Sequence, residues 1–372
     1  MFFFTASYNL VIPEMNTIIS NLNGADYKGW IIALFTISAG ISRPFSGKLS
    51  DAIGRKKVMV IGLLVCGIMS LLYPLCTSVL LLLILRFFHG FSTGFFPTGA
   101  TALITDIIPS NKRGVAMGIW GTFMSLGMGV GQGCSTFTVH QFGTNGMFVC
   151  ALTLVGISYL LLFYSAETLI HAEKFNFRML ALKKDEIIER NVIPVAIVML
   201  ISSICSGIIL VLTPDISENL SLNNKGAFFI YSVLATIVVR LVSGGLSDRI
   251  GRRQTLLIGM ALLAIAMYLV GTATTPFMFQ FSSVLFGIST GICSPTLFAW
   301  TADLSPENRR GIGAGTMFIA LEIGICLGSI ITNVIYQNNE SNIVLVFYFG
   351  TGAILATMIY LIWHLIRRKS LT

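Results

Sequence analysis

Long apolar segments, separated by short polar stretches, recur from one end of the chain to the other. The segments are about 18–25 residues long, enough for a helix to cross a hydrocarbon core about 30 Å thick. They are continuously apolar and do not alternate with polar residues, which favours helices over the strands of a membrane barrel. We therefore predict an all-α integral membrane protein with twelve transmembrane helices, near residues 1–20, 29–46, 58–76, 79–105, 114–139, 146–166, 192–213, 226–243, 255–272, 276–302, 311–336 and 343–364.

The longest polar stretch, residues 167–191, divides the predicted helices into two sets of six. It mixes acidic and basic residues with Phe175, Phe177 and Leu180, which is typical of an amphipathic segment at a membrane surface. We assign no chemistry to it. The predicted domains are a six-helix bundle over 1–166, a cytoplasmic linker over 167–191 and a second six-helix bundle over 192–372.

The two halves of the chain carry an internal repeat. The segment Gly47–Lys56 returns 197 residues later as Gly244–Arg253, and the same offset relates Asp106–Gly114 to Asp303–Gly311. One constant offset through several helices indicates two copies of one unit, related by an axis along the membrane normal. Because such halves rock against each other in transporters, the repeat points to transport.

Composition and charge agree with a membrane location. Hydrophobic residues make up 55% of the chain and charged residues only 11%, about half the charged fraction of a soluble domain. The net charge is +8, and nineteen of the 24 Lys and Arg residues fall in alternate loops. This distribution follows the positive-inside rule, so we expect the cell inner membrane, both termini in the cytoplasm and no nucleic-acid partner.

The sequence offers no signal for catalysis or for a bound cofactor. Seven cysteines are scattered without paired spacing, which argues against a disulfide framework or a metal site. We find no nucleophile triad, metal cluster or phosphate-binding loop in the sequence. The chain is therefore predicted not to be an enzyme and to use neither a cofactor nor a metal, with an ion or substrate gradient as its energy source.

Two motifs carry a resemblance to a known family. The pattern Gly-x-Leu-x-Asp-x-x-Gly-Arg-Lys/Arg, present in both halves, resembles the signature loop of the major facilitator superfamily. Arg86-x-x-His89-Gly90 resembles the second motif of that superfamily. The chain looks most like the twelve-helix drug:proton antiporters, although Gln132 stands where their helix-5 motif usually has Pro. The resemblance implies alternating access, with a central cavity lined mainly by the first, fourth, seventh and tenth helices.

We name residues 47–56 and 244–253 the gating loops. The resemblance implies that their carboxylates and basic residues latch the cytoplasmic ends of the halves in the outward-open state. A purely structural reading, as topology anchors and helix caps, stays open, and Asp106 with Arg113 and Asp303 with Arg310 are expected to cap the next cytoplasmic turns. The gating residues are Gly47, Asp51, Gly54, Arg55 and Lys56, their counterparts Gly244, Asp248, Gly251, Arg252 and Arg253, and the upstream Arg43 and Arg240.

Ionisable residues within apolar segments are costly and are therefore candidate cavity residues. Arg86 and His89 share one helix face and suit a wall that holds an anionic group and responds to protonation. Glu322 falls near the middle of the eleventh predicted helix, where burial favours the neutral carboxyl group, so we predict a proton-carrying or cation-binding acid. In each case a structural role, paired with neighbouring groups, is the alternative.

Glu14 and Asp215 each follow a proline near the outer end of a predicted cavity helix. They could frame an external mouth, or they could be helix-end acids that face water.

The predicted function is secondary active transport of a small organic solute, drug-like or a metabolite, outward across the membrane and coupled to protons. The first alternative is a proton-coupled transporter of a defined metabolite such as a sugar or an organic anion, which Arg86 and His89 would favour. A non-transporting membrane sensor is a further alternative. The expected partners are the solute, protons and the lipid bilayer, and the protein is expected to be a monomer.

Overall fold

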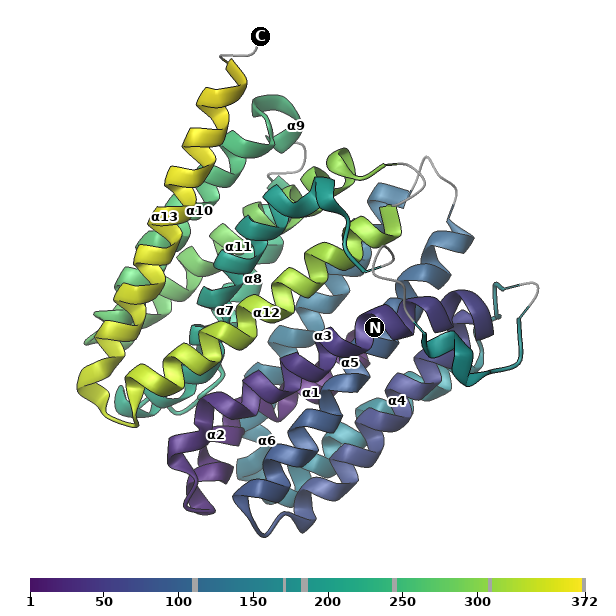
Figure 1. Ribbon diagram of the computed structural model, residues 1–372. Helices are drawn as coiled ribbons and strands as arrows, with labels where there is room; N and C mark the ends of the chain where they lie inside the picture. Colours follow the sequence, from purple (N-terminus) through teal and green to yellow (C-terminus); the bar gives the residue numbers. More distant parts are fainter. Residues whose placement is uncertain (109–112, 170–171, 182–186, 243–245, 307–309, 370–372) are drawn as a thin grey trace. The chain divides into compact units, whose positions relative to one another are not determined.

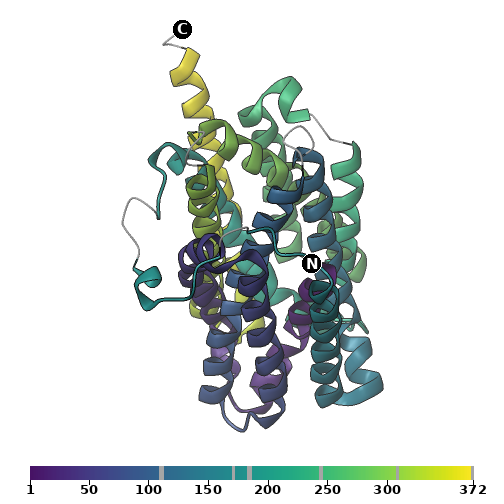
Figure 2. The same ribbon diagram turned by 90° about the vertical axis from the view of Figure 1, so that its right-hand side faces the viewer.

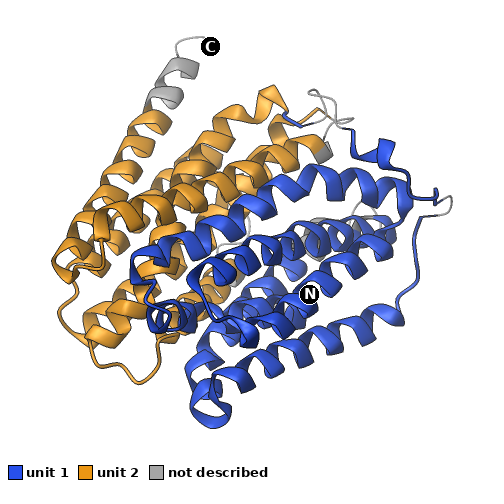
Figure 3. Ribbon diagram, turned by 60° about the horizontal axis from the view of Figure 1, so that its bottom comes forward, with its two compact units in different colours: residues 1–188 blue, residues 189–372 orange. Residues whose placement is uncertain are grey.

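A computed structural model describes residues 1–108, 113–169, 172–181, 187–242, 246–306 and 310–369. Every regular element in these ranges is a helix (Figure 1, Figure 2). The chain forms two compact units, residues 1–188 and 189–372 (Figure 3). The described part of the predicted linker up to residue 188 belongs to the first unit. The fold-class prediction of an all-α protein is confirmed.

The first unit holds the helices of the first repeat. The helix predicted near 1–20 is divided at Val11, because Pro13 lacks the backbone N–H that a continuous helix would use there. A single element covers the predicted helices 114–139 and 146–166, and the chain bends inside it at Gly143, whose φ of 73° is favoured by glycine. The helices are α1 (Phe2–Leu10), α2 (Ile12–Asn21), α3 (Lys28–Ile53), α4 (Arg55–Leu72), α5 (Val79–Ile107) and α6 (Arg113–Phe163), with the short 3₁₀ turns η1 (Ala25–Tyr27), η2 (Tyr73–Leu75) and η4 (Phe177–Leu180).

The second unit repeats this order. Its helices are α7 (Ile193–Asn219), α8 (Ala227–Val242), α9 (Leu246–Ile250), α10 (Arg252–Gly271), α11 (Pro276–Leu304), α12 (Arg310–Tyr336) and α13 (Ile343–Lys369), with η6 (Arg190–Val192) and η8 (Glu340–Asn342). The equivalent helices α5 and α11 begin alike, since Ser78 and Thr275 occupy the same repeat position. Each side-chain hydroxyl accepts from a backbone N–H in the first turn of its helix, at 3.3 Å in both units.

The surface of these helices is apolar. Leu80 is 69% exposed, Phe277 79% and Ile359 68%, exposures that suit hydrocarbon and not water. In the part of the chain that the structure describes, eight helices are long and apolar enough to cross a membrane, α6 being long enough for two predicted spans. The remaining predicted spans correspond to α1 with α2, to α3 and to the shorter α8.

Glycines set the closest helix contacts within each unit. A Cβ on Gly127 or Gly131 of α6 would stand 2.5 Å from a backbone oxygen of α1. A Cβ on the repeat-related Gly324 or Gly328 of α12 would likewise stand 2.2 or 2.1 Å from a backbone oxygen of α7. Small residues therefore let the first and fifth helices of each bundle pack backbone to backbone.

Candidate functional site

The first gating loop brings one arginine between two carboxylates. Arg55 begins α4, and its Nη1 donates to Asp51 Oδ1 at 2.5 Å and to the Ser50 carbonyl at 2.6 Å. Its Nε donates to Asp106 Oδ2, near the end of α5, at 3.1 Å. This contact joins the α3–α4 turn to the end of α5. We call Asp51, Arg55 and Asp106 the first Asp–Arg–Asp cluster.

The second gating loop builds the same arrangement from the same repeat positions. Arg252 pairs through Nη1 with Asp248, and its Nε donates to Asp303 Oδ2 at 2.9 Å. Its Nη1 also donates to Ser247 Oγ at 2.6 Å. Asp248, Arg252 and Asp303 form the second Asp–Arg–Asp cluster. Ion pairs at such helix ends fix the turn that connects two neighbouring helices.

Asp106 and Asp303 form ion pairs with the gating loops, which was not predicted from the sequence. They were expected to cap turns together with Arg113 and Arg310, but they contact Arg55 and Arg252. The Arg113 and Arg310 side chains lie outside the described residues, so those pairings stay untested. The equal spacing of each Asp from its loop arginine, the same in both repeats, was the signal available in the sequence.

The other gating residues lie around these clusters. Lys56 Nζ donates to the carbonyls of Phe163 and Ser165 at 2.8 and 2.9 Å, and Arg253 lies over the Trp300 ring at 5.6 Å. Arg240 Nη2 donates to Ser294 Oγ of α11 at 3.4 Å. Arg43 is partly buried in α3, and Gly244 lies outside the described residues. Gly54 and Gly251 both have positive φ, and an added Cβ on Gly47 would have no described atom within 4 Å.

Arg86 and His89 are completely buried in α5. Arg86 donates through Nε to the Ile31 carbonyl at 3.2 Å, and its guanidinium lies 4.5 Å from the centre of the Phe35 ring. Its Nη1 and Nη2 make no hydrogen bond to any described residue. A buried guanidinium with two unused donor groups has the chemistry to bind a carboxylate or another anion.

His89 is held in a chain of hydrogen bonds that crosses the first unit. Its Nδ1 lies 3.0 Å from the Tyr73 hydroxyl, and its Nε2 lies 3.3 Å from Cys66 Sγ. Cys66 Sγ lies in turn 3.4 Å from Ser7 Oγ of α1. Both ring nitrogens therefore have partners from other elements. Sequence reasoning missed Tyr73, Cys66 and Ser7, because hydroxyl and thiol groups are common in membrane helices.

The three candidate acids are buried as well. Thr136 Oγ1 of α6 donates to Glu14 Oε1 at 2.9 Å, and the Tyr336 hydroxyl of α12 donates to Asp215 Oδ2 at 3.2 Å. Glu322 is 7% exposed in α12, two residues before the close contact of Gly324 with α7. Glu14 lies where α2 contacts α6, and Asp215 lies at the corresponding contact of α7 with α12 in the second unit. Glu322 also belongs to the second unit.

Gln132, which stands where antiporters usually have Pro, lies in the glycine-rich seam between α1 and α6. Its side chain is fully buried, and its Nε2 donates to Asn9 Oδ1 at 2.9 Å. The residue thus gives the two helices a polar contact where a proline would bend one of them. Among the described residues, no group of three or more His, Cys, Asp or Glu is placed to hold a metal ion.

Comparisons with known proteins agree with this architecture. The multi-drug resistance efflux pump PmrA of Streptococcus pneumoniae is 27% identical over 345 residues, covering 88% of this chain and 84% of PmrA. The multidrug resistance protein MdtG of Salmonella heidelberg is 25% identical over 391 residues, covering 98% and 93%. The crystal structure of the human organic anion transporter MFSD10 (TETRAN) aligns with a TM-score of 0.73 at 17% identity, covering 97% and 96%.

The structural likeness confirms the fold predicted from the sequence, twelve helices in two repeats. The family model described as Major Facilitator Superfamily matches residues 1–193 and 195–371, almost the whole chain. Members of this family are membrane carriers and not enzymes. The chain belongs to the major facilitator superfamily.

Proposed function

We propose that this transporter exports a small organic solute in exchange for protons by alternating access. The observation that carries the proposal is a set of ionisable side chains, Arg86, His89 and Glu322, buried inside units whose outer surface is apolar. Such groups are costly in a membrane interior, so they are rare there, and those that occur commonly belong to a transport pathway. The names of PmrA and MdtG, which describe drug efflux and drug resistance, support the outward direction and the choice of solute.

In this proposal Glu322 carries the coupling proton, and Glu14 and Asp215 frame the outer mouth of the pathway. The bundles over residues 1–166 and 192–372 move relative to each other, and the 167–191 segment joins them on the cytoplasmic side. The protein works as a monomer in the inner membrane. The distribution of basic residues over alternate loops supports a cytoplasmic location of both termini.

The two Asp–Arg–Asp clusters act as the cytoplasmic latch. Their equivalence in the two units supports this role, because each fixes the same turn of its repeat. Removal of one carboxylate, as in Asp51→Asn, should shift the population toward the inward-open state. Spin-label distances across the cytoplasmic side measure that shift, and an unchanged distance distribution in Asp51→Asn would remove the latch from the proposal.

The central test is solute-driven proton flux in proteoliposomes, screened against a panel of cationic, neutral and anionic compounds. Glu322→Gln keeps the size of the side chain but holds no exchangeable carboxyl proton. It should abolish uphill transport while leaving solute exchange without a gradient intact. Wild-type proton coupling in Glu322→Gln would show that another group carries the proton.

Organic-anion transport is the second candidate, and the unused Nη1 and Nη2 donors of Arg86 favour it. The likeness in fold to MFSD10, a human organic anion transporter, agrees with this candidate. Arg86→Lys keeps the charge but loses the planar pair of donors. If the solute is an anion, this variant should raise its KM at least about tenfold, whereas the KM of a cationic drug should change little.

A further inference from the structure

The first turn of α4 is capped by a carboxylate that lies far from it in the sequence. Glu167, just beyond the end of α6, accepts from the Arg55 backbone N–H through Oε1 at 3.1 Å. Its Oε2 accepts from the Lys56 backbone N–H at 2.9 Å. One carboxylate thus satisfies two N–H groups that a helix start leaves without partners, at the positive end of the helix dipole.

Gly54 of the gating loop makes room for this carboxylate. Its φ is 120°, a conformation that residues with side chains rarely adopt. A Cβ at this position would stand 2.6 Å from Glu167 Oε2. The glycine therefore serves both the backbone turn and the approach of Glu167.

Neighbouring residues tie the same segment to the first Asp–Arg–Asp cluster. Thr168 Oγ1 donates to Asp106 Oδ2 at 2.7 Å, the same oxygen that accepts from Arg55. Farther along, the Glu173 backbone N–H donates to the Ala52 carbonyl at 2.8 Å, and Lys48 Nζ donates to the Ala181 carbonyl at 2.6 Å. The segment after α6 therefore contacts the gating loop on both sides of its turn, at the end of α3 and at the start of α4.

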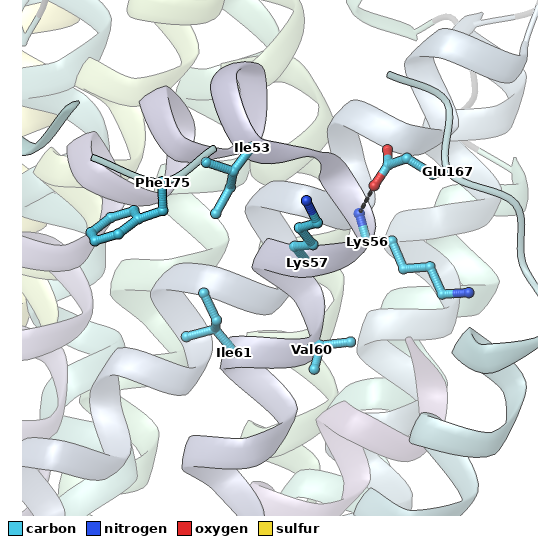
Figure 4. A pocket seen from close by; sticks show the side chains of 7 residues that line it. All are labelled: Ile53, Lys56, Lys57, Val60, Ile61, Glu167 and Phe175. Atoms are coloured by element: carbon cyan, nitrogen blue, oxygen red, sulfur yellow. Dashed lines mark hydrogen bonds between the residues drawn. The ribbon is translucent and has the colours of Figure 1, made fainter. Parts of the chain in front are cut away.

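Figure 4 shows this region from close by, with the Glu167 carboxylate joined to Lys56 at the start of α4 and Phe175 on the far side of the same surface pocket. The pocket has a volume of about 600 Å³ and lies along the first turns of α4. Its lining comes from the end of α3, from α4 and from the linker: Ile53, Lys56, Lys57, Val60, Ile61, Glu167 and Phe175.

In the second unit, the side-chain oxygen nearest the equivalent glycine belongs to the helix itself. Gly251 has a φ of 96°, and a Cβ there would stand 2.5 Å from Oε1 of Gln254, in the first turn of α10. The repeat position of Gln254 in the first unit is Lys57, which offers no acceptor, and the repeat position of Glu167 is His364. Among the described residues, a linker carboxylate at a helix start is therefore found at the first gating loop.

We propose that Glu167 is a positioning residue of the latch: by capping α4 it orients Arg55 toward Asp51 and Asp106, and it makes the first gating loop depend on the linker. The inference rests on the proposed latch function. A break of the cap frees the Arg55 and Lys56 amides and lets the first turn of α4 unwind. Arg55 then loses its fixed position between the two carboxylates, and the latched state becomes less populated.

The experiment compares wild type with Glu167→Ala, the nearly isosteric Glu167→Gln, and Glu173→Ala as a matched control. Glu173 is an exposed acid on the same segment, whose contact with Ala52 uses only its backbone. Amide hydrogen exchange of Arg55 and Lys56 in nanodiscs reports the cap. Spin labels at exposed Tyr164 and Arg249, one in each unit, report the latch, with Asp51→Asn as reference.

Both Glu167 variants should exchange the two amides at least about tenfold faster and shift the spin-label distances in the direction of Asp51→Asn. Their transport should show a lower kcat with little change in KM, and Glu173→Ala should match wild type in all three readouts. Gly54→Ala should reproduce the Glu167→Ala result, because its Cβ displaces the carboxylate.

Three outcomes would overturn the inference. Unchanged amide exchange in Glu167→Ala would show that the cap has no energetic weight. Faster amide exchange in Glu167→Ala with wild-type spin-label distances, in an experiment where Asp51→Asn shifts those distances, would show that the latch does not need Glu167. If neither Glu167→Ala nor Asp51→Asn shifts the distances, the latch itself is refuted, and the positioning role of Glu167 is refuted with it. Proton-coupled transport is tested separately, by Glu322→Gln.

Discussion

His89 lies between a phenol and a thiol, each on a different ring nitrogen. Both partners come from outside its own helix, since Tyr73 belongs to η2 and Cys66 to α4. The ring is therefore fixed in position as well as buried. A buried polar group that loses such a partner keeps the cost of having left water without the compensating hydrogen bond.

Tyr73→Phe removes the hydroxyl and keeps the ring that stacks on Phe148. We expect it to lower the free energy of unfolding by about 0.5–2 kcal/mol, the range for side-chain hydrogen bonds between membrane helices. The matched control is Tyr348→Phe, since Tyr348 is 45% exposed and stacks on Tyr268. Denaturant unfolding in mixed micelles measures both. Equal effects of the two substitutions would contradict a structural role for the Tyr73 hydroxyl.

At this scale the sequence identifies residues but not their partners. Arg86, His89 and Glu322 could be picked out because a charge in an apolar segment is rare. Glu167 could not, because an acid in a polar linker looks like any other solvated charge. Its importance comes from a contact with a helix start 112 positions earlier, which no local pattern encodes.

At the scale of elements, the α1–α6 contact depends on the absence of side chains. The glycines at 127 and 131 bring α6 against the backbone of α1, and Gln132 adds its hydrogen bond to Asn9 beside them. The same glycine positions recur in α12 against α7. The repeat therefore preserves close backbone packing more faithfully than it preserves the polar contact.

Gly131→Ala places a methyl group 2.5 Å from the Ala6 carbonyl oxygen and should push α1 away from α6. We expect a loss of about 1–3 kcal/mol in unfolding free energy, typical of overpacking. Gly156→Ala, also in α6 but with no described atom within 4 Å of its Cβ position, should be neutral or slightly stabilising. Thermal unfolding of the two variants distinguishes these expectations, and similar melting temperatures would argue against close contact at Gly131.

Most element boundaries follow from hydrophobicity, but the exceptions have local causes. Pro13 divides the first predicted helix, and Gly143 bends α6 where a loop was expected between two helices. The short helix α9 within the second gating loop was not predicted, because five polar and apolar residues in a charged loop carry no helical period. Length and apolar composition predict spans, whereas breaks depend on single residues.

At the scale of the whole molecule, each unit has its own core and its own Asp–Arg–Asp cluster. The constant 197-residue offset made this duplication visible in the sequence, so the fold class and the internal repeat could be predicted in full. The solute could not, since it depends on the shape of a cavity and on a few side chains.

If the units are independent in this sense, residues 1–188 and 189–372 expressed as two separate chains should assemble into an active transporter. We expect measurable solute transport, at a turnover below that of the intact chain. Coexpression followed by transport assays in proteoliposomes tests this, with each half alone as the control. Complete loss of activity despite normal insertion of both halves would show that covalent connection is needed.

The hydrogen bonds of the linker to the α3–α4 turn also bear on how the protein can be tagged and monitored. An epitope or fluorescent reporter inserted between Glu167 and Ala181 would interrupt a segment that forms hydrogen bonds with α3 and α4. The reporter would then measure a protein whose gating loop is altered. Insertions for labelling or purification belong outside that stretch, and antibodies raised against it are candidate inhibitors.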